Sequence, residues 1–399
     1  MDHTNAVFDF DGSVTEETLR AYLSRAVTLT TDPHDWPKEP HNEHIKEFIL
    51  DTGAKYICRF GCIWDPSQKD LDTYPEQKKF IEDMHASDPH IVFEGCLFEH
   101  VTEAVESLKV PKEAFEAFGL PYEDRYFRYA DMLHPSGDGK DFWSPGHSVP
   151  DITRTETQLF FYARACAYID IGYEAFHMGQ VYLMGRHDKD SGYACYTRLT
   201  QLIRAYAASH ARRHFVFLNA HIHGIIGTDG MLLLDFHMWP GRYHSDDPTS
   251  DWPQPASIRK GRVDSIYGRS LGGLTHSGWT CEHLPYLIEL DNWGNDPKQF
   301  GTRNDADITV WGYDEISWFA NQSDGYRHLF LTKIPDELAD TDPEGYFAMP
   351  GQRIAYIHSK NDTKAVSYTY FAYDKRLKKE GFGDQSVIKA VWKNRPIGR

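Results

Sequence analysis

The sequence predicts an α/β fold, namely a (β/α)8 (TIM) barrel with an N-terminal helical extension. From about residue 55 onward, short apolar runs alternate with amphipathic stretches, which is typical of repeated β-α units around a parallel sheet. The apolar runs also end in polar side chains, and in such barrels the carboxyl ends of the strands carry the chemistry. The chain accordingly divides into an extension over residues 1–54 and a barrel over residues 55–399.

Short apolar runs account for the strands of the predicted barrel. The first seven strands are expected at residues 55–64, 90–99, 173–180, 214–221, 231–237, 285–291 and 314–319. The eighth is expected at either 353–358 or 368–373. Helices are predicted over 153–167 and 196–210, where apolar residues recur at spacings of three and four. A doubly wound open sheet produces the same local alternation and is the alternative fold.

Two segments lie outside this repeat. Ser13 and Glu16 have the spacing of a capping box, which opens a helix with Leu19, Tyr22 and Leu23 on one apolar stripe. This helix is expected to cover the bottom or the side of the barrel. Residues 240–280, rich in Gly, Ser, Asp and Pro, are predicted to form a long loop, and loops of that length are usually functional.

The charge and the cysteines limit the partners and the compartment. Lys and Arg number 42 against 59 Asp and Glu, a formal net charge of -17, and no basic run offers a surface for nucleic acid. No apolar stretch approaches the roughly 18 residues of a membrane span, and the N-terminus lacks a secretory-signal pattern. The 6 cysteines include no CxxC pair, as is typical of free thiols in reducing compartments, which predicts a cytoplasmic protein. The sequence leaves open whether the chain forms a homo-oligomer.

Carboxylates gather at the predicted strand ends. Residues two apart on a strand share a face, so Glu289 points the same way as Asp291, and Asp235 the same way as His237. Where such faces line the mouth of a barrel, acids from several strands converge, and crowding in a low-dielectric site pushes their pKa values apart. One carboxyl can then donate a proton while another stays ionised. The alternative is that these acids form structural ion pairs with arginines such as Arg59.

Three segments resemble those of the (β/α)8-barrel glycoside hydrolases, namely residues 173–180, 232–239 and 287–293. The resemblance is one of architecture, covers most of the predicted barrel and indicates no single family. It implies an Asn-Glu pair after strand four and a glutamate after strand seven. On the predicted strand order, Glu315 belongs to strand seven, whereas strand four ends in Asn219 and His221 without a glutamate. The other candidates for the pair are Glu99, Asp235, Glu289 and Asp291.

The resemblance and the carboxylates together predict a glycoside hydrolase that acts on a small oligosaccharide or glycoside. The catalytic pair is predicted to be Glu99 and Glu289, with Asp235, Asp291 and Glu315 in reserve, and no cofactor or metal is expected. Hydrogen-bonding and aromatic side chains near the strand ends are predicted to bind the sugar. They are Arg59, His177, Gln180, Asn219, His221, His237, Trp239, Trp293 and Trp318.

A second hypothesis is a metal-dependent barrel hydrolase. His221 and His223 form a His-x-His pair at a predicted strand end, and Asp235 with His237 would complete a set of three or four ligands. Barrel hydrolases of the amidohydrolase kind carry such a pair on the first strand, however, whereas about three predicted strands precede it here. A third hypothesis is a barrel that binds carbohydrate without turning it over.

Overall fold

Short apolar runs, buried on both faces, form the parallel strands of the computed structural model. The structure describes residues 6–30, 41–241, 244–245, 256–257, 270–292, 303–305, 308–310, 315–357, 366–373, 375–376 and 379–399. The strands of the barrel are β1 (Ala26–Leu29), β2 (Tyr56–Gly61), β3 (Val92–Cys96), β4 (Ala175–His177), β5 (Phe217–Asn219), β6 (His237–Pro240), β11 (Tyr286–Glu289), β14 (Gly345–Phe347) and β15 (Met349–Ile357).

These strands close into a barrel in the order in which they occur along the chain. One sheet has the order β16-β15-β1-β2-β3-β4-β5, where β16 (Val366–Phe371) is an antiparallel addition, and a second has the order β14-β11-β6. A single residue, Ala348, separates β14 from β15, so the two together count as the eighth strand. The N–H of Ala348 donates to the carbonyl of Ile288 on β11 at 2.9 Å. At the other seam the N–H of Met238 donates to the carbonyl of Ala220 at 3.1 Å. The predicted (β/α)8 barrel is thereby confirmed.

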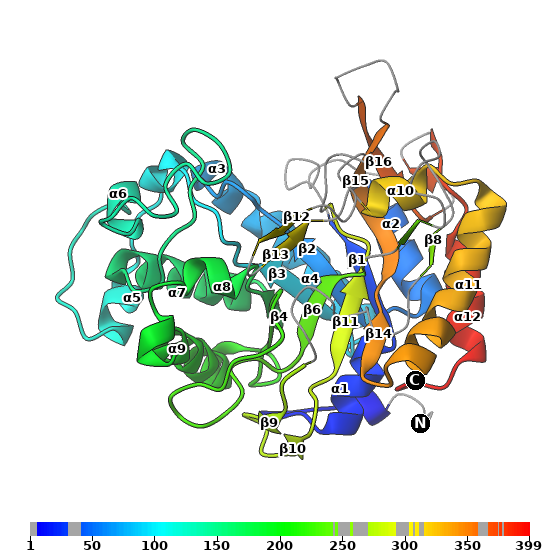
Figure 1. Cartoon of the computed structure of the whole chain (residues 1–399), viewed down its shortest axis with the longest axis horizontal. Coiled ribbons are helices and arrows are strands. Elements are labelled where there is room, and N and C mark those ends of the chain that lie inside the picture. Colours follow the sequence, from blue (N-terminus) through cyan, green and yellow to red (C-terminus); the bar gives the residue numbers. More distant parts are fainter. Residues whose placement is uncertain are drawn as a thin grey trace.

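Helices fill most of the connections and surround the strands. Figure 1 shows α5 to α9 on one side of the strands, with α11 and α12 on the opposite side. None of the helices in the described ranges has both the length and the apolar composition needed to cross a bilayer. The helices are α1 (Glu16–Leu23), α2 (His41–Thr52), α3 (Gln68–Leu71), α4 (Tyr74–Ser87), α5 (Lys112–Ala117), α6 (Tyr129–Met132), α7 (Thr155–Asp170), α8 (Val181–Met184), α9 (Ala194–His210), α10 (Glu315–Ala320), α11 (Asp324–Thr341) and α12 (Gln385–Asn394).

Short elements decorate the connections. The 3-10 turns are η1 (Ala6–Phe8), η3 (Glu103–Ser107) and η4 (Lys189–Ser191). The two-stranded ribbons pair β7 (His244–Ser245) with β8 (Ala256–Ser257), β9 (Gly273–Leu274) with β10 (Thr280–Cys281), β12 (Arg303–Asp305) with β13 (Ile308–Val310), and β17 (Lys375–Arg376) with β18 (Lys379–Glu380). Three of these ribbons interrupt the connections on either side of β11, including the segment 240–280 expected to be a loop.

The barrel begins earlier along the chain than predicted from the sequence. Strand β1 lies within residues 1–54, yet Val27 pairs with Ile57 of β2 and with Met349 of β15. The boundary predicted between residues 54 and 55 therefore does not separate the extension from the barrel. Because β1 follows α1 after only a short turn, its apolar residues continue the apolar stripe of the helix and give no separate signal.

Two of the predicted strands are corrected. Most of residues 231–237 precede β6, which begins at His237 and runs to Pro240. The described part of 314–319 is helical and belongs to α10, while residue 314 lies outside the described residues. Residues 353–357 of the first alternative lie in β15, which forms the barrel wall with β14. Residues 368–371 of the second lie in β16, which among the described residues pairs with β15 alone.

Helix α1 closes the amino-terminal end of the barrel. Thr15, and not the predicted Ser13, caps this helix, because the Thr15 side chain accepts the N–H of Thr18 at 3.0 Å. Leu19 and Tyr22 then pack in one cluster with interior strand residues such as Phe217. The expected cover over the bottom of the barrel is thus present.

A buried ion cluster ties α1 to the strands at this end. Glu174, just before β4, accepts hydrogen bonds from Arg212 at 2.7 Å and from Arg213 at 2.8 and 2.9 Å. Arg213 also donates to the hydroxyl of Tyr22 on α1 at 2.7 Å. Removing one partner of such a cluster leaves the opposite charge without compensation.

We expect Glu174→Gln to lower the free energy of unfolding by about 3 kcal/mol, because two arginines then lose their counter-charge. Urea unfolding of both proteins measures the difference. The matched control is Glu282→Gln, at a carboxyl 93% exposed, which should change stability by no more than about 0.5 kcal/mol. Equal losses in the two variants would contradict a stabilising role for this cluster.

Candidate active site

The site begins with Arg59, whose backbone departs from regular strand geometry. Its φ is 62°, in the left-handed region that residues with a side chain seldom adopt, and the register of β2 against β3 shifts between Ile57 and Gly61. The N–H of Arg59 donates to Oε1 of Glu94 on β3 at 3.0 Å. This irregularity allows the guanidinium to be buried inside the barrel, where Arg59 is 4% exposed.

Two arginines hold the carboxylates at the end of β11. Arg59 pairs with Oε1 of Glu289. Arg353 of β15 lies 2.7 Å from Oε2 of Glu289 and 2.7 Å from Oδ1 of Asp291. Nε2 of His221, which follows β5, lies 3.3 Å from Oε1 of Glu289 and 2.9 Å from the Arg59 guanidinium. This buried cluster joins the second, seventh and eighth strands near the carboxyl end of the barrel.

The arginines keep the two carboxyl groups ionised. Burial by itself raises the pKa of a carboxyl group, but the charges of Arg59 and Arg353 outweigh burial and lower the pKa of Glu289 to about 2. The pKa of Asp291 is likewise well below its usual value, because Arg353 and then Arg59 oppose the effect of burial. Glu289 is therefore a carboxylate at neutral pH, suited to stabilise a positive charge or to act as nucleophile or base.

A chain of hydrogen bonds determines the tautomer of His177. Glu94 accepts the hydroxyl of Tyr56 at 2.7 Å and Nδ2 of Asn219 at 2.6 Å. With its amide nitrogen donating, Asn219 uses Oδ1 to accept Nδ1–H of His177 at 2.6 Å. Nε2 of His177 then carries the lone pair, and it has no hydrogen-bond partner among the described residues. Burial and the charge of Arg59 lower the pKa of His177, so this imidazole is a neutral acceptor.

Glu99 approaches the end of β4 from the loop after β3. Its Oε2 accepts the N–H of Gln180 at 2.9 Å, and its Oε1 accepts the side-chain amide of Gln180 at 3.3 Å. Gly179 has φ 61°, and a Cβ at this position would overlap Oε2 of Glu99. The Glu99 carboxyl therefore sits at the carboxyl end of the fourth strand, although residue 99 follows the third.

Two predicted site residues make their contacts elsewhere. Asp235 accepts a hydrogen bond from Arg204 of α9 at 3.0 Å, so its charge is already compensated by a helix outside the strands. Trp318 is buried on α10, where its ring meets Tyr326 and Phe330 edge-on at 6.1 and 5.4 Å.

Glu315 has a positioning role beside the cluster. It is the first residue of α10, and its Oε2 accepts the N–H groups of Gly241 at 3.1 Å and of Asp291 at 3.3 Å. These backbone groups follow β6 and β11. The carboxylate of Glu315 thus holds together the ends of two neighbouring strands, one of which carries Glu289.

The aromatic wall expected around the site is only partly described. The ring of His237 stacks on Trp239 at 5.7 Å, and Trp239 stacks on Tyr286 at 4.5 Å. Nδ1 of His237 lies 3.2 Å from the hydroxyl of Ser270, and burial lowers the pKa of His237 to about 3. Trp293 lies outside the described residues.

The four ligands of the metal hypothesis do not form one group. They are His221, His223, Asp235 and His237. One ligand atom of His221 instead lies within 4.8 Å of ligand atoms of Glu289 and Asp291. A cation bound there would have to displace the arginines that already neutralise both carboxylates. The geometry therefore gives this hypothesis no support.

Glu94 and Arg353 are not among the site residues predicted from the sequence. Each is a charged residue inside an apolar run, and a charge on a strand buried on both faces needs a partner in the interior. A charged residue inside an apolar run is therefore the sequence feature that could have identified both residues. With β1 counted as the first strand, β11 is the seventh, so Glu289 and not Glu315 occupies the position that the resemblance assigns to a glutamate.

The sequence matches no protein family model and no curated protein. Among solved structures, a GH113 beta-1,4-mannanase is 11% identical, with 93% of this chain and 99% of the mannanase covered and a TM-score of 0.44. A debranching enzyme from Nostoc punctiforme is 11% identical, with 93% of this chain and 81% of the enzyme covered and a TM-score of 0.40. At such identities the similarity to these glycoside hydrolase barrels concerns the course of the chain and not the chemistry of the site.

We expect Gly179→Ala to displace the Glu99 carboxylate, because the added methyl group would take its place over the end of β4. The free energy of unfolding should fall by roughly 2 kcal/mol more than in the control, since the hydrogen bonds to Gln180 are lost. The control is Gly12→Ala, which has nearly the same φ, 69°, but no atom within 4 Å of its new Cβ. Equal losses in urea unfolding would show that only backbone strain had been measured.

Proposed function

We propose that the protein is a glycoside hydrolase that cleaves the O-glycosidic bond of a small oligosaccharide or glycoside, with Glu289 as its ionised carboxylate. The observation that carries this proposal is the buried pairing of Glu289 with Arg59 and Arg353 near the carboxyl end of the barrel. Glycoside hydrolysis passes through a transition state with positive charge at the anomeric carbon. A carboxyl group with a pKa of about 2 stays ionised and stabilises that charge.

Glu99 is the proposed proton donor. Its carboxyl lies at the end of the fourth strand, although Glu99 follows the third strand in sequence and is not part of the Asn-Glu pair that the resemblance implies. Its hydrogen-bond partners are the backbone and side-chain amides of Gln180, whereas Glu289 pairs with two arginines. The proton of Glu99 passes to the glycosidic oxygen as the carbon–oxygen bond breaks. Water then supplies the hydroxyl at the anomeric carbon and returns a proton to the pair.

Polar groups beside Glu289 are proposed to bind the hydroxyls of the sugar. Nε2 of His177 and Nε of Arg59 are buried and have no hydrogen-bond partner among the described residues. A buried polar atom without a partner costs about 1–3 kcal/mol, so a ligand that supplies one gains affinity. One nitrogen accepts and the other donates, which matches a hydroxyl group able to do both. Asn219 and His221 complete this group of substrate-binding residues in the proposal.

We expect Glu289→Gln to lower kcat by at least about 1000-fold, because the neutral amide cannot stabilise the developing positive charge. Activity is measured on a panel of aryl glycosides that differ in the sugar and in the anomeric configuration. Calorimetric titration with the sugar product checks that the variant still binds.

The matched control is Glu174→Gln, since Glu174 is also buried between arginines but lies at the opposite end of the barrel. Its activity, measured well below its melting temperature, should stay near that of the natural chain. A natural chain that binds sugars but turns over no member of the panel would support the non-catalytic barrel instead. Equal loss of kcat in the two variants would remove Glu289 from the mechanism.

We expect Glu99→Gln to show a strong dependence on the leaving group. With an alkyl glycoside, whose leaving oxygen needs a proton, kcat/KM should fall by about 100-fold to 10,000-fold. With a dinitrophenyl glycoside, whose phenolate leaves without one, the loss in the bond-breaking step should be several times smaller. The ratio of the two losses is measured under single-turnover conditions. Identical losses on both substrates would assign Glu99 a role other than proton donation.

A further inference from the structure

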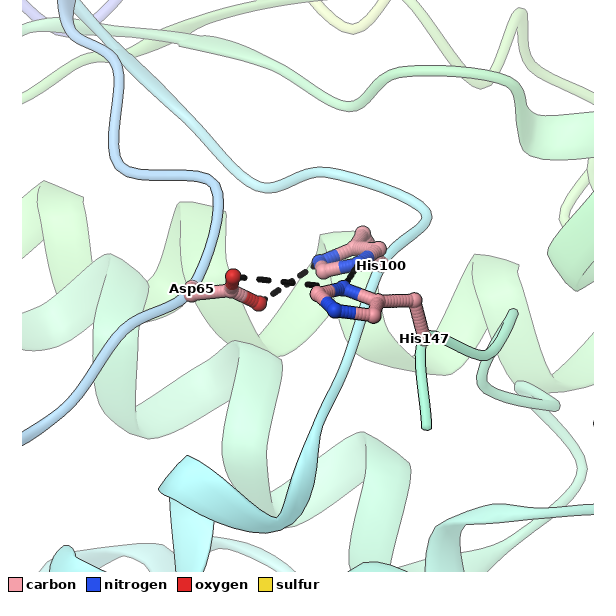
Figure 2. A group of neighbouring side chains, drawn as sticks. All are labelled: Asp65, His100 and His147. Atoms are coloured by element: carbon pink, nitrogen blue, oxygen red, sulfur yellow. Dashed lines mark hydrogen bonds and ion pairs between the residues drawn. The ribbon is translucent and has the colours of Figure 1, made fainter. Parts of the chain in front are cut away.

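A second group of side chains with metal-binding chemistry lies at the rim of the barrel. Asp65 follows β2, His100 follows β3, and His147 belongs to the long insertion before α7. Figure 2 shows the two imidazole rings one above the other, with the carboxylate of Asp65 beside them. One ligand atom from each residue lies within 4.8 Å of the other two. Three separate segments of the chain therefore meet here.

The tautomer of His100 follows from its backbone contact. Nδ1 of His100 lies 3.0 Å from the carbonyl of Trp64, which can only accept, so Nδ1 carries the proton. Oδ1 of Asp65 lies 3.1 Å from the same nitrogen. Nε2 of His100 consequently carries a lone pair, which faces Nδ1 of His147 at 2.9 Å. A metal-binding histidine whose other nitrogen donates to a carbonyl or a carboxylate is the usual arrangement in zinc proteins.

The distances suit a cation. Nδ1 of His147 lies 4.0 Å from Oδ2 of Asp65. Ligand atoms around a tetrahedral Zn²⁺ lie about 3.3 Å apart, so these two atoms have to approach each other by roughly 0.7 Å to share a metal. The side chains of Asp65 and His147, 42% and 39% exposed, have room for this movement.

The local charge also favours a cation at this position. Among the described residues, Asp65 is the carboxylate whose charge acts on His100. Arginines accompany the other two clusters of this kind in the described part of the chain. Arg59 and Arg353 occupy the cluster around Glu289, and Arg186 pairs with an aspartate that contacts His187 in the third. The third cluster consists of His134, Asp151 and His187.

We propose that Asp65, His100 and His147 form a binding site for Zn²⁺ or a similar divalent transition metal, with two imidazoles and one carboxylate as ligands and water in the remaining position. Two nitrogen donors and one oxygen donor match the preference of Zn²⁺ rather than that of Mg²⁺ or Ca²⁺, which take oxygen ligands. This proposal does not depend on the glycosidase activity, because its test measures metal binding.

A metal at this site would order one side of the barrel mouth. Trp64 stacks on His100 with ring centroids 4.5 Å apart and meets Trp143 edge-on at 5.9 Å. Nε1 of Trp143 in turn donates to the backbone carbonyl of Glu99 at 3.1 Å. The ligands therefore connect the loops after β2 and β3 with the insertion, next to the residue proposed as proton donor.

The test is a calorimetric titration of the chelator-treated, tag-free full chain with ZnCl₂. We expect one tight site per chain, and a loss of affinity of at least about 100-fold in Asp65→Asn and in His147→Ala, since removing a ligand costs more than removing its outer partner. These residues are half-exposed, so both variants should fold. Binding of Co²⁺ should give a visible absorption band of tetrahedral type in the natural chain and not in the two variants.

The matched control is His187→Ala, which removes a partly exposed histidine from the third cluster and should leave the affinity unchanged. Absence of tight binding in the natural chain would overturn the proposal. It would also be overturned by tight binding that survives both ligand substitutions, or by binding that is lost in His187→Ala and kept in His147→Ala. None of these outcomes bears on glycosidase activity, so failure here and failure of the proposed function are distinguished.

Discussion

The burial of the Glu289 carboxylate is the electrostatic constraint on which the rest of the site depends. Removing a charge from water costs several kcal/mol, and only opposite charges in good geometry offset that cost. Here the opposite charges are Arg59 and Arg353, which come from the second and eighth strands, while Glu289 ends the seventh. These strands face a common interior only when the sheet is closed. Closure of the barrel is therefore a requirement for the ion cluster, and the cluster in turn links strands across the barrel.

The same constraint explains the unusual backbone at Arg59. A left-handed conformation at a residue with a side chain costs about 1–3 kcal/mol and persists only where the surroundings enforce it. The hydrogen bond from its N–H to Glu94 and the pairing of its guanidinium with Glu289 provide that enforcement. Glu94 has surroundings different from those of Glu289. Burial raises the pKa of Glu94, and its side-chain partners are a tyrosine hydroxyl and an amide. One barrel thus holds acids in contrasting environments, which is the basis of acid–base catalysis by carboxyl pairs.

Prediction from sequence worked where a segment is long and its neighbours in the chain determine its structure. The helices at 155–170 and 194–210 and the strands around residues 58, 94 and 288 were predictable for this reason. Residues 315–320 were not, because Glu315 and Ser317 alternate with Ile316 and Trp318 as in a strand. A helix of six residues is too short for its own period to be distinguished from that alternation.

By itself, the sequence determined the repeat of strands and helices, the lack of a basic run and the presence of acids at strand ends, since these are properties of composition and local spacing. Glu99 and Glu289 became the predicted catalytic pair on that basis. Only the tertiary structure decided which charges meet. The pairs of Arg59 and Arg353 with Glu289 join residues 230 and 64 positions apart, and no local pattern encodes contacts across such distances. The meeting of Asp65, His100 and His147 is also a tertiary effect, because the pairing of β2 with β3 and the fold of one insertion bring them together.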